Sequence, residues 1–525
     1  MSALRTKIIR GAQRAAGVID DVASIVSPTW AARREYVRQA RKVRARYDGG
    51  TSGRRAENWL SGHGSANAQI APFVRVLRSR ARDLVRNNEY ARRAKTVYQS
   101  NVIGTGIKPV YKENEELSRL LRQYIGGGDN GIWKPLPDAE MRKSLFAIER
   151  LAEGERIESG EMFIKREWRT RRQMDEMGLP VPFQMRCLEP EFLDETIDGE
   201  QPNGNLAVRG VEVDDFGRIV AYHFYEEHPY GHLGSGSLKS QRVDADDVIH
   251  IYDEERAGQV RGVTRFAPVM LKMRDYSEYE DVQLVRQKIA ASFVAFMRRP
   301  HGGAKVTADG DSDTEMQIRP GMVRELPPGY DIEFGKPPGV DGFKDFSQVT
   351  LQSIATGMDV PYEDLTGDNS QVSFISGRLA RISFDMTNDV LQEEVWGPKF
   401  CWKFDRWFRE GAAMVGVRNA LDGGGIRADR ARWNTPNRKM LDPGAETTAI
   451  IRKIRGGVNS WQDEVRQTGR DPDEVLREYV EDKERFDELG IILDSDPRKT
   501  TQAGLTPTIV TEEFREEHTE EGEEE

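Results

Sequence analysis

The stretch VPYEDLTGDNSQVSFISGRLARISFDM, from Val360 to Met386, joins two segments whose apolar residues have helical spacing. Its centre, residues 367–373, is polar and contains neither a metal-ligand spacing nor a phosphate-binding glycine pattern. A helix is expected from about Ser373 to Val395, where Pro398 breaks or kinks it before an aromatic-rich helix. The stretch is therefore interpreted as a polar crossing between helices.

The bulk composition indicates a large protein without a membrane span. At 525 residues the chain is long enough for two to four packed units, and 38% of its residues are hydrophobic and 31% charged. No run approaches the ~18 uncharged apolar residues of a spanning helix. Cys187 and Cys401, the only two cysteines, lie in apolar and aromatic contexts. We interpret them as buried thiols in a protein made in the cytosol.

The charge is distributed unevenly. The net charge is −10, yet residues 1–110 hold 22 Lys/Arg against 7 Asp/Glu, and the last fifteen residues hold nine Glu and one Arg. A basic head of this kind is compatible with nucleic acid, a membrane surface or an acidic partner, and equally with a solvated helical arm. The acidic tail is expected to be disordered.

Helices are predicted on both sides of a β region. Residues 70–101 place Val74, Leu77, Ala81, Leu84 and Ala91 on one helical face, and the pair of asparagines at 87–88 indicates a joint between two helices. From about 155 to 252 the apolar period changes to two, which predicts antiparallel strands. Within them Asp214 to Arg218 predicts a hairpin turn, because Gly217 can take a positive φ.

A helical hairpin with an insertion is predicted next. A long helix is expected over 264–298, with Val282, Val285, Ile289, Phe293 and Phe296 in one apolar stripe. A second helix over 343–357 runs back, and the loop-rich residues 300–342, with strand-like MVREL and YDIEF, lie between the two. Three short charged helical segments are expected over 443–489.

No enzyme site is predicted. The segments IGTGIKP and FGKPP lack the Gly-Lys-Ser/Thr of a phosphate loop, and no Gly-x-Ser-x-Gly elbow or Cys/His pairing occurs. Asp309, Asp311 and Asp313 imitate a calcium loop, but Thr314 and Pro320 stand where its glycine and its glutamate belong. The histidines His223, His228 and His232 could meet only in a suitably folded β hairpin, and no Cys or second acidic cluster joins them. No metal or cofactor is therefore predicted, and the aromatic residues around Trp402 are interpreted as core.

Five segments in fixed order give the chain a close resemblance to the lambda-type portal protein family of tailed bacteriophages, from about Phe73 to Gly490. They are RSRARDLVRNNEYARRAKTVYQSNVIGTGIKP, GRIVAYHFYEEHP, GQVRGVTRFAPVM with YEDVQLVRQKIAASFVAFM, LPPGYDIEFGKPP, and VPYEDLTGDNSQVSFISGRLA. The resemblance implies an α+β portal-protein fold with a helical stem and crown, a mixed α/β wing and a small clip insertion. The implied boundaries are a basic arm and linker (1–69), the wing (70–263), a stem helix (264–299), the clip (300–342), a second stem helix (343–358), the tunnel-loop crossing (359–378), a long helix with an aromatic-rich helix (379–440), crown helices (441–490) and an acidic disordered tail (491–525).

The resemblance also implies a function without catalysis. Portal proteins form a ring, usually of twelve subunits, at one capsid vertex, through which double-stranded DNA is packaged and later ejected. The implied partners are other copies of the chain, double-stranded DNA without sequence preference, the terminase large subunit, a head-completion or connector protein, and the major capsid or scaffold protein, with no membrane. The expected location is the portal vertex of the virion, after assembly in the host cytoplasm.

Two sets of site residues follow from the resemblance. The clip residues that would meet the terminase and the connector are Asp309, Asp311, Asp313, Arg319 and Arg324, and the DNA-channel loop residues are Asp368, Asn369, Ser370, Gln371, Ser373 and Arg378. Neutral hydrogen-bonding groups suit a channel, because strong ion pairs with phosphates would stall sliding DNA. Common members carry Tyr and a Ser-Ser-Ala-Arg-like run here, whereas this chain has Phe374 and ISGR.

Several alternatives stay open on the sequence alone. Arg378 and Arg381 are compatible with contacts to phosphates and with ion pairs to a neighbouring subunit. A DNA-processing enzyme subunit, such as a terminase or nuclease, is the alternative function, although the missing phosphate loop argues against it. A membrane-surface scaffold that uses the basic N-terminus is a third hypothesis.

Overall fold

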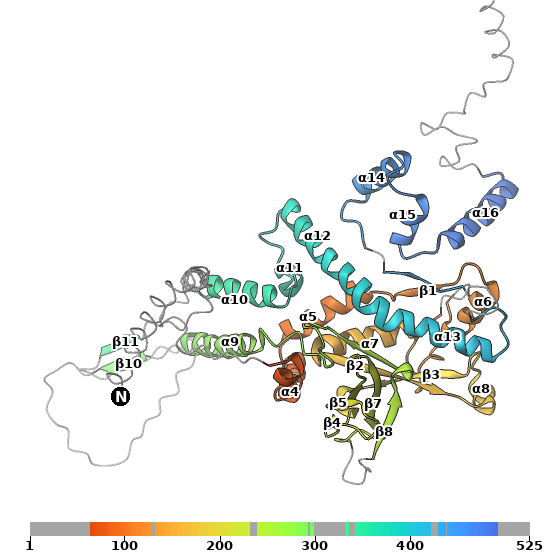
Figure 1. Ribbon diagram of the computed structural model, residues 1–525. Coiled ribbons are helices and arrows are strands. Elements are labelled where there is room, and N and C mark those ends of the chain that lie inside the picture. The colour runs from red at the N-terminus through yellow and green to blue at the C-terminus, as the bar shows by residue number, and fades with distance from the viewer. Residues whose placement is uncertain are drawn as a thin grey trace, which may run out of the picture. The chain divides into compact units, whose positions relative to one another are not determined.

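The computed structural model has a mixed α+β fold, as the sequence predicts (Figure 1). It describes residues 64–127, 132–231, 239–291, 295–298, 331–334, 342–421, 429–436 and 438–491. From Ser65 onward the chain forms one compact unit. The predicted basic arm, most of the clip and the acidic tail lie outside the described residues.

The first helices form around an asparagine joint. They are α3 (Ala66–Ile70), α4 (Val74–Asn87), α5 (Glu89–Tyr98) and the π-helical continuation η3 (Gln99–Ile103). Asn88 has an extended backbone, and its side chain accepts a hydrogen bond from the Ala91 N–H, so it caps α5. The predicted joint is therefore confirmed. Val74, Ala81 and Ala91 are buried, as the apolar spacing predicts.

Two antiparallel sheets occupy the predicted β region. A three-stranded sheet has the order β3-β2-β9, and a five-stranded sheet has the order β4-β5-β6-β7-β8. Their strands are β2 (Glu161–Trp168), β3 (Phe183–Leu188), β4 (Gly199–Glu200), β5 (Leu206–Val208), β6 (Val211–Val213), β7 (Ile219–Tyr225), β8 (Ser240–Asp244) and β9 (Val248–Tyr252). Between β6 and β7, Gly217 has φ +80° and the Asp214 N–H donates to the Arg218 carbonyl (2.9 Å), which confirms the predicted hairpin turn.

The three-stranded sheet is buried on both faces. Met162 and Ile164 of β2 point into the larger hydrophobic core, whereas Phe163 between them points into a smaller core shared with the five-stranded sheet. The alternating side chains of β2 thus join the two cores.

Helices and short elements complete this part: α6 (Glu115–Ile125), α7 (Leu145–Glu158), α8 (Arg171–Met177), η5 (Pro190–Phe192), η6 (Ala245–Asp247), and strand β1 (Lys108–Val110) paired with β12 (Arg432–Asn434).

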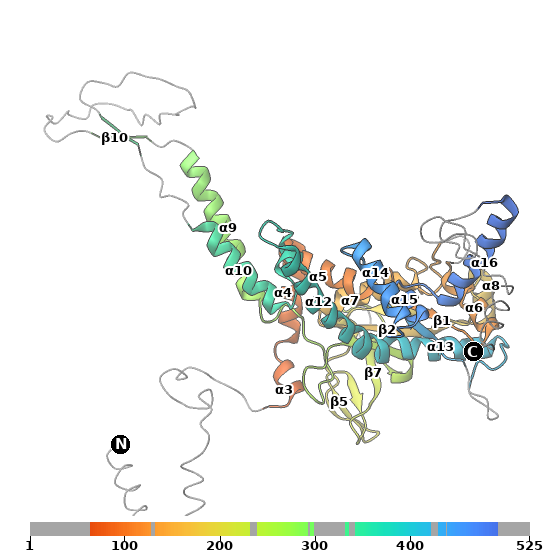
Figure 2. The same cartoon turned by 90° about the horizontal axis from the view of Figure 1, so that it is seen from above.

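Helices α9 (Met270–Ala291) and α10 (Phe343–Gly357) lie side by side (Figures 1 and 2). The Tyr279 ring contacts the rings of Phe343 and Phe346 across the pair. The bounds of α10 are those predicted, but the expected helix over 264–298 is wrong at both ends. Residues Ala295–Arg298 instead form β10, which pairs with β11 (Asp331–Phe334), so a ladder satisfies their backbone groups.

The apolar stripe predicted on α9 is not its buried face. Met273 and Tyr276 are buried, whereas Val282 and Val285 are exposed. Of the predicted stripe, Val282, Val285 and Ile289 lie on α9, Phe296 lies in β10, and Phe293 is outside the described residues, so the stripe does not continue beyond α9 as predicted.

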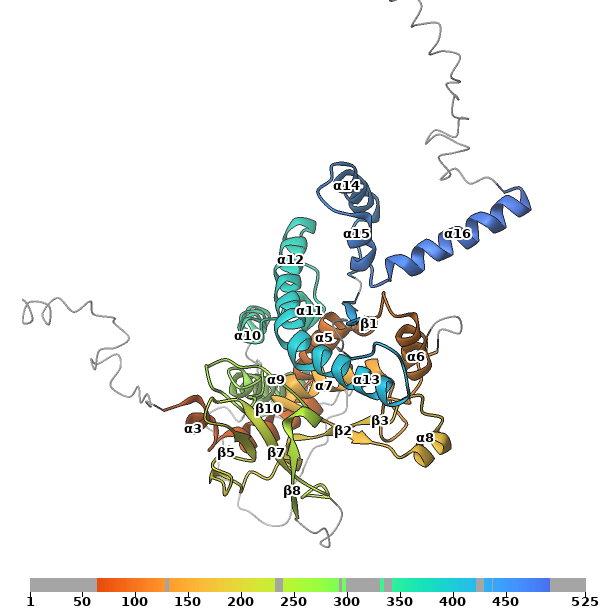
Figure 3. The same cartoon turned by 45° about the vertical axis from the view of Figure 1, so that its right-hand side comes forward.

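Of the break or kink predicted at Pro398, the break does not occur. Helix α12 (Phe374–Val390) continues into the π-helical segment η7 (Leu391–Cys401) and then α13 (Trp402–Met414), with Pro398 inside η7 (Figure 3). The wider π winding accommodates a residue that cannot donate the usual helical hydrogen bond. Phe400, Phe404, Trp407 and Phe408 are buried, as expected of core residues, although Trp402 is exposed.

Three short helices follow in the predicted region: α14 (Pro443–Arg455), α15 (Trp461–Gln467) and α16 (Pro472–Leu489). No side chain of α14 is buried. No helix among the described residues has the length and apolar composition needed to span a membrane. Cys187 is partly buried and Cys401 is buried, and both are free thiols whose pKa is raised by burial.

Candidate functional site

The crossing segment consists of the short helix α11 (Tyr362–Thr366), a loop and the start of α12. Gly367 ends α11 in the left-handed conformation (φ +74°), and its N–H donates to the Glu363 carbonyl (2.7 Å). Ser373 begins α12 as its N-cap, since its Oγ accepts from the Ser376 N–H (3.2 Å). The Ser376 Oγ accepts in turn from the Ser373 N–H (3.0 Å), which completes a capping box.

This geometry corrects the extent of the predicted loop. Asp368, Asn369, Ser370 and Gln371 lie in the loop, and Ser373 closes it as the N-cap. Arg378, by contrast, lies within α12. The helix expected from about Ser373 is therefore confirmed at its start, and the part of the predicted loop beyond Ser373 belongs to α12.

All four side chains of the loop proper are exposed. Asp368 accepts a hydrogen bond from the Ser370 N–H (2.9 Å), and contacts with Ser370 hold the pKa of this carboxyl below its usual value. Asp368 is therefore ionised at neutral pH and repels other anions. Asn369, Ser370 and Gln371 present neutral hydrogen-bonding groups to the solvent. The loop thus offers a polar surface without a positive charge.

Contacts from Tyr98, Arg265 and Arg93 hold the chain before the loop. The Tyr98 hydroxyl donates to the Met358 carbonyl (2.7 Å), and Arg265 forms an ion pair with Asp359 (2.6 Å), which has φ +53°. Leu365 of α11 is buried, and the Arg93 Nε donates to the Asp364 carbonyl (2.8 Å). The backbone leading into the loop is therefore fixed to α5 and to the residues before α9.

Helix α12 holds the other end of the loop. Phe384 is buried, and its ring meets the Tyr98 ring edge-on with centroids 6.0 Å apart. Arg381 forms an ion pair with Asp385 in its own helix (3.1 Å), whereas Arg378 is exposed and has no ion pair with any residue that the structure describes. Of the two arginines, Arg378 is therefore the one left available for an outside partner.

A cluster of strongly perturbed charges lies elsewhere, around Glu161 at the start of β2. Glu161 is fully buried and accepts hydrogen bonds from Arg78 (3.0 Å), Arg261 (2.6 Å) and the Gly262 N–H (2.8 Å). Burial alone would raise the pKa of Glu161, but Arg261 and His250 together hold it far below its usual range. Such perturbation is common at active sites, yet Glu161, Arg78, Arg261 and His250 are all buried. The cluster therefore serves as a structural junction.

The histidines considered as metal ligands lie apart. The His223 Nε2 lies 3.3 Å from Glu212, whereas the His228 Nε2 lies 3.4 Å from Glu189, and His232 is outside the described residues. Glu189, Glu191 and His228 come within 4.8 Å of one another. Arg82 lies 2.9 Å from Glu191 and 3.5 Å from Glu189, and Arg78 lies 3.5 Å from Glu191, so two cations face these two carboxylates. This group is explained as an ion-pair network.

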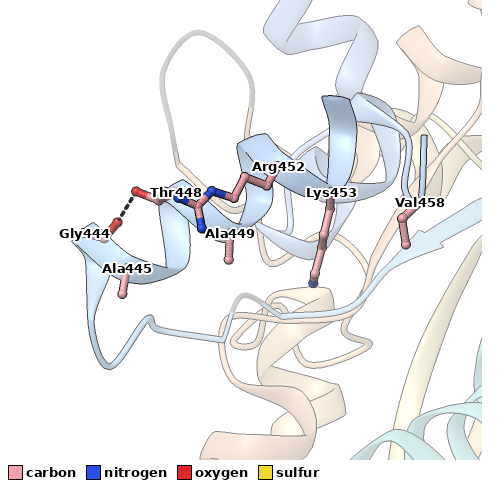
Figure 4. Close-up of a pocket in the computed structure, with 7 residues that line it drawn as sticks. All are labelled: Gly444, Ala445, Thr448, Ala449, Arg452, Lys453 and Val458. Carbon is pink, nitrogen blue, oxygen red and sulfur yellow. Dashed lines mark hydrogen bonds between the residues drawn. The ribbon is translucent and has the colours of Figure 1, made fainter. Parts of the chain in front are cut away.

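An open groove of about 680 Å³ lies along α14. Figure 4 shows its lining, in which the Thr448 hydroxyl donates back to the Gly444 carbonyl (2.9 Å). The lining residues are Gly444, Ala445, Thr448, Ala449, Arg452, Lys453 and Val458. Its two ionisable side chains, Arg452 and Lys453, are both cationic, so the groove offers no acid–base pair for catalysis. The predicted clip residues, Asp309, Asp311, Asp313, Arg319 and Arg324, lie outside the described residues.

The sequence matches a known family over much of this architecture. The profile described as "Phage portal protein, lambda family" matches residues 52–392. The chain belongs to this family. The match spans the crossing segment and all of α12, as well as α9, α10 and both sheets. The predicted family is therefore confirmed, and the chain is a bacteriophage portal protein.

Individual relatives agree with the family. The probable portal protein of Halomonas phage phiHAP-1 is 26% identical over 454 residues, covering 82% of this chain and 84% of the relative. The portal protein of Escherichia phage N15 is 22% identical (82% and 88% covered), and portal protein B of Escherichia phage lambda is 21% identical (83% and 89% covered).

Solved structures of similar chains include a gene transfer agent neck and a phage portal protein. The neck of a native gene transfer agent particle has a chain 14% identical, with a TM-score of 0.43, and the match covers 74% of this portal chain and 93% of that one. An HK97-family phage portal protein from Corynebacterium diphtheriae is 11% identical, with a TM-score of 0.31 and coverage of 71% and 97%.

One feature of the portal chain was not singled out from its sequence. The outer face of α12 carries Ile375, Leu379, Ile382, Met386 and Val390, and all five side chains are exposed. Their spacing of four, three, four and four residues was visible in the sequence and indicates one continuous helical face.

Proposed function

We propose that this portal chain forms a ring of about twelve copies at one capsid vertex, with residues 367–373 facing the channel through which double-stranded DNA passes. The observation that carries the proposal is the crossing segment itself. It is held on one side by the buried hydrogen bond from Tyr98 to Met358 and on the other by the buried side chain of Phe384, and between them it presents Asp368, Asn369, Ser370 and Gln371 to solvent.

The chemistry of the loop suits passage of DNA better than binding of DNA. Each phosphate that a cationic side chain neutralises strengthens sequence-independent binding. The loop has no cationic side chain, and the ionised Asp368 adds repulsion. Moving DNA therefore meets neutral groups that exchange their hydrogen bonds readily with water.

The remaining regions follow from family membership. We assign the wing to 70–263, the stem to α9 and α10, the clip to 300–342 and the crown to 441–490. Docking of the terminase large subunit and of a head-completion or connector protein is assigned to the clip, and contacts with the capsid or scaffold to the outside of the ring. The place of action is the portal vertex of the virion, after assembly in the host cytoplasm, and no catalysis is assigned to the chain.

Electron microscopy and native mass spectrometry of the purified chain test the ring. We expect ring-shaped particles of roughly a dozen subunits with a central channel. A stable monomer at micromolar concentration, with no rings at any ionic strength, would overturn the proposal. Magnesium-dependent ATP hydrolysis or DNA cleavage by the pure chain would instead support a DNA-processing enzyme.

A charge change in the loop tests the channel assignment. The triple variant Asn369→Lys, Ser370→Lys and Gln371→Lys adds three cations per copy, and Asp215→Lys in the exposed β6–β7 turn is the matched control. We expect both variants to form normal rings. The triple variant should package less DNA per particle, because phosphates bind the added cations. Normal packaging by the triple variant would show that residues 367–373 do not face the channel.

A further inference from the structure

Two different helices of this chain present apolar faces that the described residues leave uncovered. We infer that the outer face of α12 in one copy packs against the outer face of α9 in a second copy. The inference rests on the proposed ring and names the surfaces that build it.

The α12 face is long, and the residues that the structure describes leave it uncovered. Phe384 and Asn388 are buried on one side of the helix, whereas Ile375, Leu379, Ile382, Met386 and Val390 lie on the opposite side with 48–72% of each side chain exposed. From Ile375 to Val390 the face extends about 22 Å along the axis. A continuous apolar ridge of this length on a helix is typical of an interface.

The α9 face has the same spacing. Leu271, Asp275, Glu278, Val282 and Val285 follow one another at intervals of four, three, four and three residues, so they share one side of the helix. The three apolar members are exposed, while Met273 and Tyr276 bury the other side of α9 within the chain. A heptad-like face therefore remains on α9, with two carboxylates in its N-terminal half.

The charges select this pairing over a symmetric one. Arg378 flanks the α12 face and has no ion pair among the described residues, and Asp275 on the α9 face likewise has none. Glu278 meets only Arg274, in an exposed pair (3.0 Å). Two α12 helices packed in parallel would bring Arg378 of both copies together, whereas α12 on α9 brings Arg378 toward carboxylates.

The pairing also has the symmetry that a ring needs. It joins two different surfaces, so each copy offers one face to the copy before it and the other to the copy after it. Such a heterologous contact closes a ring, whereas a face that binds itself stops at a dimer.

Thiol cross-linking of assembled rings tests the contact. Leu379→Cys is combined with Val282→Cys in one chain and with Val285→Cys in another, and a short bifunctional thiol reagent is added. We expect a ladder of covalent oligomers from at least one pair and none from the single variants or the parent, whose own thiols are buried or partly buried. The pair Leu379→Cys with Tyr479→Cys asks whether α16, which is also acidic and partly apolar, is the occupant instead.

Charge reversal tests the same contact without cross-linking. We expect Arg378→Glu to raise the concentration needed for ring assembly about ten-fold or more, and the added substitutions Asp275→Arg and Glu278→Arg to restore assembly. Arg172→Glu in α8, an exposed arginine in a helical ion pair, is the matched control and should leave assembly unchanged.

The outcomes separate this inference from the proposed function. Rings that give no ladder with Val282→Cys or Val285→Cys, a ladder with Tyr479→Cys alone, or an Arg378→Glu chain that assembles normally would each overturn the α12–α9 contact while the ring stands. If the parent chain forms no rings, the proposed function itself fails.

Discussion

The Glu161 junction and helix α12 depart from the usual distribution of side chains in opposite directions: the junction buries charged groups, and α12 exposes apolar ones. At the junction, charged side chains are buried, and both oxygens of Glu161 accept hydrogen bonds from Arg78, Arg261, Gly262 or His250. Along α12, apolar side chains are exposed on the outer face, while Asn388 on the inner face is buried with neither amide atom hydrogen-bonded.

The difference distinguishes a region whose buried charges are paired within one chain from a region whose apolar side chains stay exposed in that chain. The junction links α4, β2 and β9 through groups that the chain supplies itself, so its stability should be a property of the single subunit. The outer face of α12 contributes little to the stability of the single chain, because apolar area stabilises a protein only when it is removed from water. A second surface that covered this face would supply that stabilisation. The predictions below test the two regions in order of expected effect.

The largest effect is expected from Glu161→Gln. The substitution keeps the side-chain volume but leaves Arg78 and Arg261 buried with one fewer counter-charge, and it should lower the free energy of unfolding by about 3–5 kcal/mol. Urea or thermal unfolding of the dissociated chain measures this loss.

The control is Glu176→Gln, which removes an exposed ion pair with Arg172 in α8. It should change the same free energy by less than about 0.5 kcal/mol. If the two variants lose similar stability, the junction is not the structural centre that its burial indicates.

A second prediction concerns pH and His250. Burial lowers the pKa of His250 to about 4, from 6.5, despite the opposing hydrogen bond to Glu161, and Arg261 acts in the same direction as burial. Between these two values the unfolded chain binds a proton that the folded chain does not. Stability is therefore full above pH 6.5 and is lost as the pH falls toward 4, by on the order of 2–3 kcal/mol.

Unfolding midpoints measured at pH 7, 6, 5 and 4 test this slope. His250→Gln should flatten the curve between pH 6.5 and 4, while the further loss at lower pH, where Glu161 begins to take up its proton, should remain. A variant curve parallel to that of the parent would show that another group titrates.

Local sequence signals predicted the elements that depend on neighbouring residues. The Asn88 joint, the Gly217 turn and the helix Phe343–Gly357 each follow from short-range spacing or a single special residue. The start of α12 near Ser373 also follows from local spacing, whereas the extension of the loop to Arg378 came from the family resemblance and is wrong.

Features that depend on distant residues could not be predicted. Ala295–Arg298 is a strand only because Asp331–Phe334 pairs with it, and Glu161 becomes a junction only because Arg78 and Arg261 come from far along the chain. Periodicity likewise gave the stripe on α9 but not which surface covers it. The channel loop and the clip residues stay predictions that the ring experiments address.

The smallest expected effect is an increase in stability rather than a loss, and it concerns Asn388. Asn388 is buried with both amide atoms unpaired, so Asn388→Leu removes a desolvation cost at similar volume and should raise the free energy of unfolding by about 1–2 kcal/mol. Gln392, one turn along the same helical run, is the matched position, because its amide donates to the Val102 carbonyl (2.7 Å). Gln392→Leu leaves that carbonyl without its partner and should lower stability by a similar amount.

Opposite signs at two neighbouring buried amides would show that α12 keeps Asn388 at a cost to the single chain. Equal losses at both positions would mean that Asn388 has a hydrogen-bond partner in solution, and the contrast with the Glu161 junction would disappear.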